Sequence, residues 1–144
     1  NKCKLCMFGM CDNSNLPNYV EYYQNPTKQK LVDLYSDADI FLFPSLEEGW
    51  GLTPLEAMAC GCIVVGTNTG FVLDIGKNEE NMMISEPGNL KQMRENIDII
   101  LNNKDLRNNI IENAIKTVEK LNWNNSCAQL EKILKTTCKI EERR

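Results

Sequence analysis

The most informative absence in this chain of 144 residues is histidine, which does not occur at all. Serine and cysteine nucleophiles are commonly activated by a histidine base, so Ser-His and Cys-His machinery is excluded. The pair Cys3-x2-Cys6, with Cys11 nearby, is a poor zinc motif, because no second C-x2-C pair follows and no histidine can complete the site. We therefore expect no metal, and we interpret the N-terminal thiols as small apolar groups of a strand.

Positive charge and long apolar runs are also scarce. The chain has 16 basic and 20 acidic residues, which gives a net charge of −4 and a pI of about 4.9. Duplex nucleic acid is usually bound by a basic stripe, so no nucleic-acid partner is expected. No apolar run reaches the ~20 residues of a transmembrane segment, and the N-terminus has no signal-peptide layout. We expect a cytoplasmic protein whose seven cysteines, an odd number, are reduced.

The length and the periodicity of the apolar residues predict the fold. The length fits one domain over residues 1–144. Short β-prone runs alternate with helical patterns, which predicts an α/β, Rossmann-like, mainly parallel sheet flanked by helices. The expected strands are Lys4–Phe8, Tyr19–Tyr23, Ile40–Phe43, Ile63–Val65 and a weak Met82–Ile84. The expected helices are Lys28–Ser36, Pro54–Cys60, Leu90–Leu101, Lys104–Leu121 and Asn125–Thr136, the last three forming a helical C-terminal segment before a frayed tail, 137–144.

One stretch, "PSLEEGWGLTPLEAMACGC" from Pro44 to Cys62, has the composition of a ligand site. Pro54 suits the first position of a helix, and Thr53 with Glu56 three residues later forms the pattern of a capping box. The loop before it, rich in glycine, would then present free amides at the positive end of the helix. Such amides bind anions, most naturally phosphate or diphosphate, beyond the strand ends of an α/β sheet.

Two carboxylates flank this loop, Glu48 at its mouth and Glu56 in the first helical turn. A carboxylate accepts two hydroxyl hydrogen bonds, which suits a ribose diol. From the spacing alone two interpretations stay open for each. Glu56 is either a ligand or only the capping partner of Thr53, and Glu48 is either a ligand or a solvated loop charge like Glu47.

The same stretch resembles the nucleotide-sugar-binding half of retaining glycosyltransferases of the GT-B fold, particularly glycosyltransferase family 4, the group 1 type. The family signature P-S-x-x-E-G-[FW]-G-L-x-x-L-E-A-M-A-x-G-x-x-V-V is matched from Pro44 to Val65. Its paired glutamates are separated by seven residues, a register that Glu48 and Glu56 fit and Glu47 does not. The segments "KQKLVDLYSDADIFLFPS" and "NKDLRNNIIENAIKTVEKLNW" also look like the family, so the resemblance covers nearly the whole chain.

The resemblance implies glycosyl transfer from a nucleotide-diphosphate sugar, with retention at the anomeric carbon, to an acceptor such as a polysaccharide or glycolipid. Glu48 would be the catalytic residue that faces the donor sugar, without acting as a nucleophile, and Glu56 would bind the ribose. The donor-binding residues would be Glu48, Gly49, Trp50, Gly51, Leu52, Thr53 and Glu56. No metal or other cofactor is implied, because helix-terminus amides stabilise the departing diphosphate. Uridine, guanosine, adenosine and thymidine diphosphate sugars are all compatible.

The sequence departs from the family pattern in two places. In "GTNTGFVLDIG" only Gly70 remains of a Gly-Gly pair and Asp74 falls one position late, so donor-sugar contacts of this loop are not carried over. The family's half also opens with a strand and a basic loop before "KLCMFG", and an acceptor-binding domain precedes it. We expect residues 1–144 to be the donor-binding half, inactive alone, with some tendency to self-associate through exposed strand edges. Whether the strand pairing is rearranged, a neighbouring chain completes the sheet or the domain is cut short stays open. The full-length enzyme would bind its acceptor mainly through the other domain and is compatible with peripheral membrane association.

Other classes of protein fit less well. Asp37-Ala38-Asp39 is a D-x-D sequence, but a helix end followed by a turn explains it. Gly49-x-Gly51 lacks the third glycine of a dinucleotide fingerprint. A nucleotide-sugar epimerase of the same fold would use histidines for catalysis, and this chain has none. A non-catalytic nucleotide-binding module, in which the two glutamates are only a cap and a surface charge, stays open.

Overall fold

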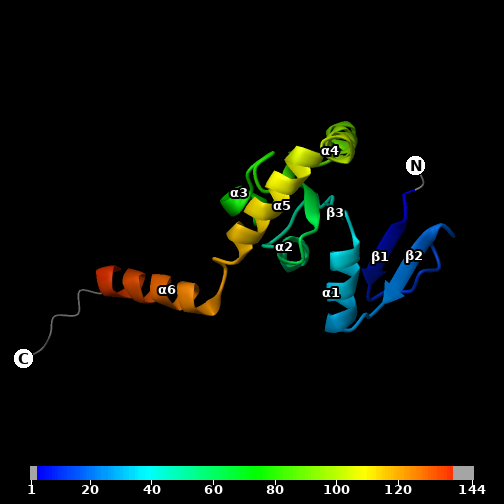
Figure 1. Cartoon of the computed structure of the whole chain (residues 1–144). Coiled ribbons are helices and arrows are strands. Elements are labelled where there is room, and N and C mark those ends of the chain that lie inside the picture. The colour runs from blue at the N-terminus through cyan, green and yellow to red at the C-terminus, as the bar shows by residue number, and fades with distance from the viewer. Residues whose placement is uncertain (1–2, 138–144) are drawn as a thin grey trace, which may run out of the picture.

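The computed structural model describes residues 3–137, and Figure 1 shows the arrangement of its elements. The strands are β1 (Leu5–Gly9), β2 (Val20–Gln24), β3 (Ile40–Phe43), β4 (Ile63–Thr67) and β5 (Met83–Ser85). The helices are α1 (Lys28–Asp37), α2 (Leu52–Ala59), α3 (Val72–Ile75), α4 (Leu90–Asn102), α5 (Lys104–Val118) and α6 (Trp123–Thr137). Every predicted element is present, and only the short α3 was not predicted. Apart from Thr137, the tail predicted to fray lies outside the described residues.

The centre of the fold is β4, whose sequence IVVGT is buried at every position. It pairs in parallel with β3 on one side and with β5 on the other. Because side chains alternate along a strand, Val64 enters one apolar cluster with Met58 and Phe71 on one face. Ile63 and Val65 enter a second cluster, with Ile100 and Ile110, on the other face. A strand covered on both faces is typical of a parallel α/β sheet, so the predicted fold class is confirmed.

The described strands form two parallel sheets instead of one. The order β3-β4-β5 makes the larger sheet, and β1 pairs only with β2. The two sheets meet through aromatic rings: Phe8 of β1 stacks on Phe41 of β3 with ring centroids 6.5 Å apart, and Tyr35 of α1 stands edge-on to both. Among residues 3–137, β1 and β3 therefore each keep one edge without a strand partner. The described strands therefore do not form one continuous sheet. The predicted self-association through these edges stays a prediction.

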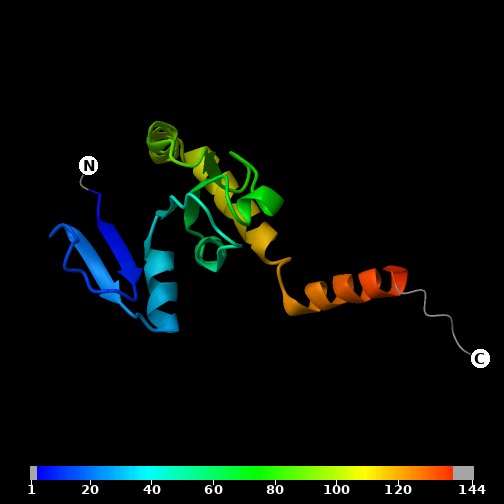
Figure 2. The ribbon, with the colours of Figure 1, turned by 180° about the vertical axis from the view of Figure 1, so that it is seen from behind.

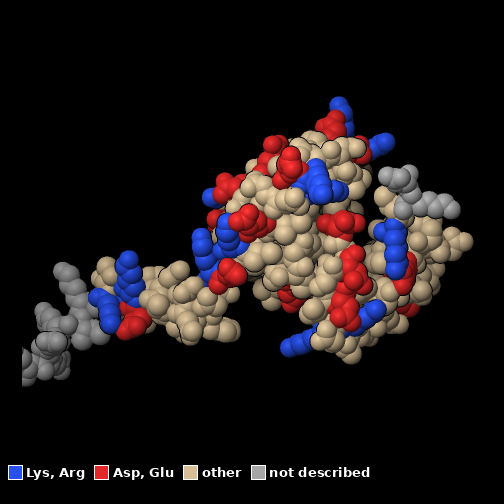
Figure 3. Space-filling view, in the orientation of Figure 1, with Lys and Arg blue, Asp and Glu red and all other residues tan. Residues whose placement is uncertain are grey.

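Helix α6 extends away from the rest of the fold (Figures 1 and 2). None of its residues is buried, and Trp123 at its start is 86 % exposed. Within residues 3–137, no helix combines the length and apolar character that crossing a bilayer requires. On the face shown in Figure 3, acidic and basic side chains are interspersed over the body of the molecule.

The cysteines differ sharply in exposure. Cys62 is 1 % exposed, and its burial, with a smaller effect of the Asp39 carboxylate, raises the pKa of its thiol to about 12. Cys3, Cys6 and Cys127 are exposed, and no cysteine among residues 3–137 is in a disulfide. Because the thiolate is the reactive form, the raised pKa lowers the reactivity of Cys62, and its burial lowers that reactivity further.

We therefore predict that iodoacetamide at pH 8 alkylates Cys3, Cys6 and Cys127 and leaves Cys62 unmodified in the folded protein. Peptide mass spectrometry measures the labelling at each position, and a sample unfolded in urea is the control in which all four react. Labelling of Cys62 as fast as that of Cys127 in the folded protein would contradict the buried position of this side chain.

Candidate functional site

The glycine-rich turn joins the end of β3 to the start of α2, and its backbone differs from the prediction. Helix α2 begins at Leu52, with Gly51 as its N-cap residue at φ 88°, and no side chain caps it. The predicted capping box of Thr53 and Glu56, with a start at Pro54, is therefore wrong. Gly51 turns the chain in the left-handed region open to glycine, two residues earlier than predicted. Pro54 is still accommodated, because its missing N–H lies in the first helical turn.

Without a side-chain cap, the first amides of α2 keep no intrahelical partner. They include the N–H groups of Leu52 and Thr53, both exposed residues, at the positive end of an eight-residue helix. Just before them, a methyl group placed on Gly49 would meet no atom within 4 Å. Gly49, Leu52 and Thr53 are therefore exposed on the surface of the turn. Trp50 lies in this segment, with 39 % of its surface exposed.

The turn is held in place by the segment that follows β4. The Thr67 hydroxyl lies 2.5 Å from the Ser45 carbonyl oxygen and 3.2 Å from that of Phe43, which ties the end of β4 to the end of β3. Further on, the Phe71 amide donates to the Trp50 carbonyl oxygen at 2.8 Å. Two loops from adjacent parallel strands thus form one rigid surface at the carboxyl ends of β3 and β4, where open α/β sheets bind ligands.

Gly70 allows these two loops to approach each other. Its φ is 55°, and an added Cβ would lie 2.6 Å from the Trp50 carbonyl oxygen and 3.0 Å from Cγ of Glu48. Sequence analysis identified Gly70 only as the remainder of a glycine pair. The structure shows that this position requires glycine both for its backbone angle and for space.

Glu48 lies between the two loops. Its carboxylate accepts a hydrogen bond from the Gly49 amide at 3.1 Å. Its Cγ lies so close to Gly51 and Gly70 that a Cβ added there would be 3.3 Å and 3.0 Å away from it. Glu47 is also exposed but makes neither of these contacts. The contacts of Glu48 therefore differ from those of Glu47, and the site role assigned to Glu48 stays a prediction.

Glu56 lies on the exposed face of α2, and its carboxylate accepts a hydrogen bond from the Tyr35 hydroxyl at 3.2 Å. Tyr35 is 3 % exposed, and burial, together with the nearby Glu56 charge, raises the pKa of its hydroxyl far above the usual range. The hydroxyl is thus protonated and donates to the carboxylate. The sequence placed Tyr35 only within the predicted helix Lys28–Ser36 and gave it no role in the site. A hydroxyl on an otherwise apolar helical face is the signal that could have identified it.

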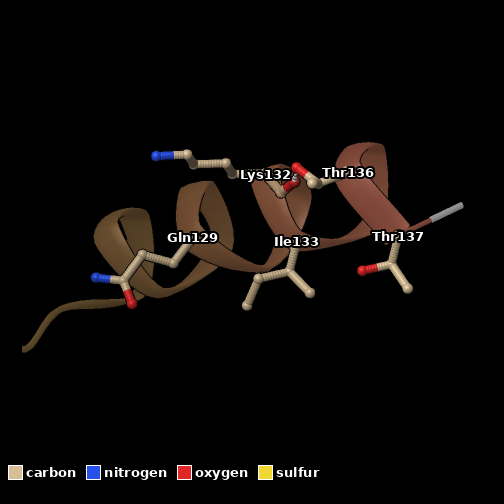
Figure 4. A pocket seen from close by; sticks show the side chains of 5 residues that line it. All are labelled: Gln129, Lys132, Ile133, Thr136 and Thr137. Atoms are coloured by element: carbon tan, nitrogen blue, oxygen red, sulfur yellow. Dashed lines mark hydrogen bonds between the residues drawn. The ribbon is translucent and has the colours of Figure 1, made fainter.

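The surface has two hollows, and the second is lined in part by Pro44 and Leu46 of the same loop and by Thr67. One, of about 390 Å³, is lined by residues of α6 alone, including Gln129, Ile133 and Thr137 (Figure 4), so it is the surface of a single helix. The other, of about 190 Å³, lies between the end of β3 and the start of α4, next to Leu46, Gly88 and Met93. Neither contains Glu48 or Glu56, since the turn is an open surface and not an enclosed pocket. Residues 3–137 contain no group of three or more potential metal ligands.

The fold has parallel strands covered by helices, and a glycine-rich turn begins α2 without a cap at the carboxyl ends of the strands. These features are typical of a Rossmann-like domain that binds a ligand at this edge of its sheet. The sequence from residue 2 to 117 matches the model of the family described as glycosyl transferases group 1. The chain belongs to this family, as its sequence motif predicted.

Known relatives agree with this assignment. The capsular polysaccharide biosynthesis glycosyltransferase CapM of Staphylococcus aureus is 30 % identical over 125 residues, which are 81 % of this chain and 33 % of CapM. The sucrose-phosphate synthase structure from Thermosynechococcus elongatus shares the fold over 93 % of this chain and 38 % of its own, with a TM-score of 0.78 and 23 % identity. Anabaena HepE in complex with UDP-glucose has a TM-score of 0.66 at 22 % identity, over 73 % of this chain and 29 % of its own. The chain spans 12 to 33 % of the length of the curated relatives that it matches.

We predict that Gly70→Ala lowers the free energy of unfolding by about 2–4 kcal/mol, since the methyl group adds a collision with the Trp50 carbonyl to the strain of a positive φ. Gly88→Ala is the matched control, because Gly88 also has a positive φ, 78°, and its nearest neighbour would lie at an ordinary 3.9 Å. That variant should lose only about 1–2 kcal/mol. Urea denaturation measures both. Equal losses would show that the loops are not in contact at Gly70.

Proposed function

We propose that this chain binds a nucleotide-diphosphate sugar and supplies the donor-binding half of a retaining glycosyltransferase. One observation carries the proposal. The uncapped start of α2, opened by Gly51, lies at the carboxyl ends of β3 and β4, with Glu48 in the preceding loop and Glu56 on the exposed face of the helix. An anion site flanked by two carboxylates suits a ligand that is negative in the middle and rich in hydroxyl groups at both ends.

The diphosphate would lie on the main chain from Gly49 to Thr53. Its negative charge would be held by free amides and by the positive end of α2. An acidic protein can bind an anion in this way without a basic patch. Because the same amides stabilise the charge that develops on the departing nucleotide diphosphate, the proposed reaction needs no metal or other cofactor.

Glu48 would lie beside the donor sugar. In the proposed reaction the bond between the anomeric carbon and the diphosphate oxygen breaks, and an acceptor hydroxyl forms the new bond on the same face of the sugar. The hydroxyl proton passes to the departing diphosphate oxygen. A carboxylate next to the anomeric carbon positions the donor and supports the positive charge of the transition state. The main-chain contact of Glu48 with Gly49 keeps the side chain at the mouth of the loop.

Glu56 would accept hydrogen bonds from the two hydroxyl groups of the nucleotide ribose. Glu56 lies in the second turn of α2 and not in the first turn, where the sequence predicted it. Its Cα is about 6 Å along the helix axis from that of Leu52, whose amide would help to hold the diphosphate. The capping box is not formed, and the carboxylate accepts a hydrogen bond from Tyr35 instead. Because Glu56 is exposed, its carboxylate can also accept hydrogen bonds from a ligand.

The relatives support the donor and acceptor classes. HepE has been solved with UDP-glucose and with UDP, and CapM is named for capsular polysaccharide biosynthesis. We propose a polysaccharide or glycolipid acceptor, bound mainly by a second domain. Because the chain spans only 12 to 33 % of its matched relatives, residues 1–144 would form one donor-binding domain that does not catalyse transfer alone.

We predict that Glu56→Gln raises the Kd for the nucleotide diphosphate by about 10- to 100-fold, because a hydrogen bond to a charged group contributes about 1.5–3 kcal/mol. Calorimetric titration of the full-length protein with UDP, GDP, ADP and dTDP identifies the nucleotide and measures the effect. Glu48→Gln should change this Kd little and lower kcat with the sugar donor, since it faces the sugar.

Glu47→Gln is the control for both substitutions, because it removes the same charge one residue outside the proposed register. It should leave both Kd and kcat unchanged. If Glu47→Gln and Glu48→Gln affect kcat equally, the assignment of Glu48 is wrong. If all four nucleotides fail to bind the full-length protein at millimolar concentration, the proposed donor site is wrong.

A further inference from the structure

We propose that Tyr35 is a positioning residue of the nucleotide site, which holds the Glu56 carboxylate in the orientation that binds the ribose. The proposal rests on the ribose-binding role of Glu56 proposed above. The residue lies on α1, outside the glycine-rich motif and 21 positions before Glu56, and the two side chains come together only in the folded chain.

The hydroxyl of Tyr35 is the only side-chain donor to Glu56 among residues 3–137, with the donor and acceptor oxygens 3.2 Å apart. The two residues contrast in exposure, since Tyr35 is buried and Glu56 is exposed. A buried and immobile donor thus holds an otherwise solvated acceptor. Each carboxylate oxygen has two acceptor positions, so the oxygen that binds Tyr35 can still accept a ribose hydroxyl.

The ring of Tyr35 cannot easily move. It packs edge-on against Phe8 of β1 at 5.8 Å and against Phe41 of β3 at 5.6 Å between ring centroids. This aromatic cluster is also the junction between the two sheets. The ring is therefore fixed by the aromatic cluster, and its hydroxyl holds the Glu56 side chain of α2 at a fixed position.

A held carboxylate binds a diol better than a free one. A glutamate on a helix surface samples several rotamers. A ligand that binds only one of them fixes the side chain, and the conformational entropy lost in this way weakens binding. Tyr35 would restrict those rotamers before the nucleotide arrives. Because burial raises the pKa of the Tyr35 hydroxyl, the donor stays protonated throughout the pH range in which an enzyme is assayed.

The test is Tyr35→Phe in the full-length protein, which keeps the ring against Phe8 and Phe41 and removes only the hydroxyl. We expect the Kd for whichever of UDP, GDP, ADP and dTDP binds to rise about 3- to 10-fold, the effect of one modest hydrogen bond. KM for the donor should rise with it, while kcat and the melting temperature stay nearly unchanged. Tyr23→Phe is the matched control, since Tyr23 also donates to a carboxylate, that of Glu21, away from the turn. It should leave Kd unchanged.

A double-mutant cycle with Glu56→Gln separates this proposal from the proposed function. If Tyr35 acts through Glu56, adding Tyr35→Phe to Glu56→Gln should weaken binding by less than about 2-fold further. An unchanged Kd in Tyr35→Phe would overturn the positioning role, and so would an equal loss in the two backgrounds. A normal Kd in Glu56→Gln would overturn the ribose role itself.

Discussion

The structure of the site depends on the backbone of Gly51. This residue turns the chain from β3 into α2 at φ 88°, and a side chain there would lie 3.1 Å from the Phe43 ring. Because Phe43 is buried at the end of β3, the turn cannot relax away from the sheet. The turn therefore starts α2 without a side-chain cap, directly above the strand ends. The free amides and the positive helix end follow from this one constraint.

The rest of the fold holds the neighbours of that turn at fixed distances. Burial of β4 on both faces places the following loop beside it, where Thr67 and Gly70 bring the two loops into contact. From the opposite side, the aromatic junction of the two sheets places the Tyr35 hydroxyl against Glu56. Two carboxylates from one short segment are thus oriented by separate parts of the structure, which gives each a distinct environment.

Much of this fold was predictable because the spacing of apolar residues along the sequence reflects which face of each helix or strand is buried. The continuous apolar runs of β3 and β4 and the helical repeats after Gly88 predicted strands and helices correctly. The capping box at Thr53 was predicted wrongly, since its pattern does not reveal that Gly51 adopts a left-handed conformation two residues earlier. Tyr35 was missed as a site residue because its contact with Glu56 joins two helices, and α3 was missed because four residues are too few for a period.

The most direct test of the central claim is amide chemical-shift mapping by NMR, with UDP, GDP, ADP and dTDP added to the isotope-labelled full-length protein. If the start of α2 holds the diphosphate, one nucleotide should shift the amide signals of Gly49, Gly51, Leu52 and Thr53, and free phosphate should shift a subset of the same signals more weakly. Shifts confined to the hollow near Gly88 and Met93, with the signals of the turn unchanged at saturation, would contradict this role of α2.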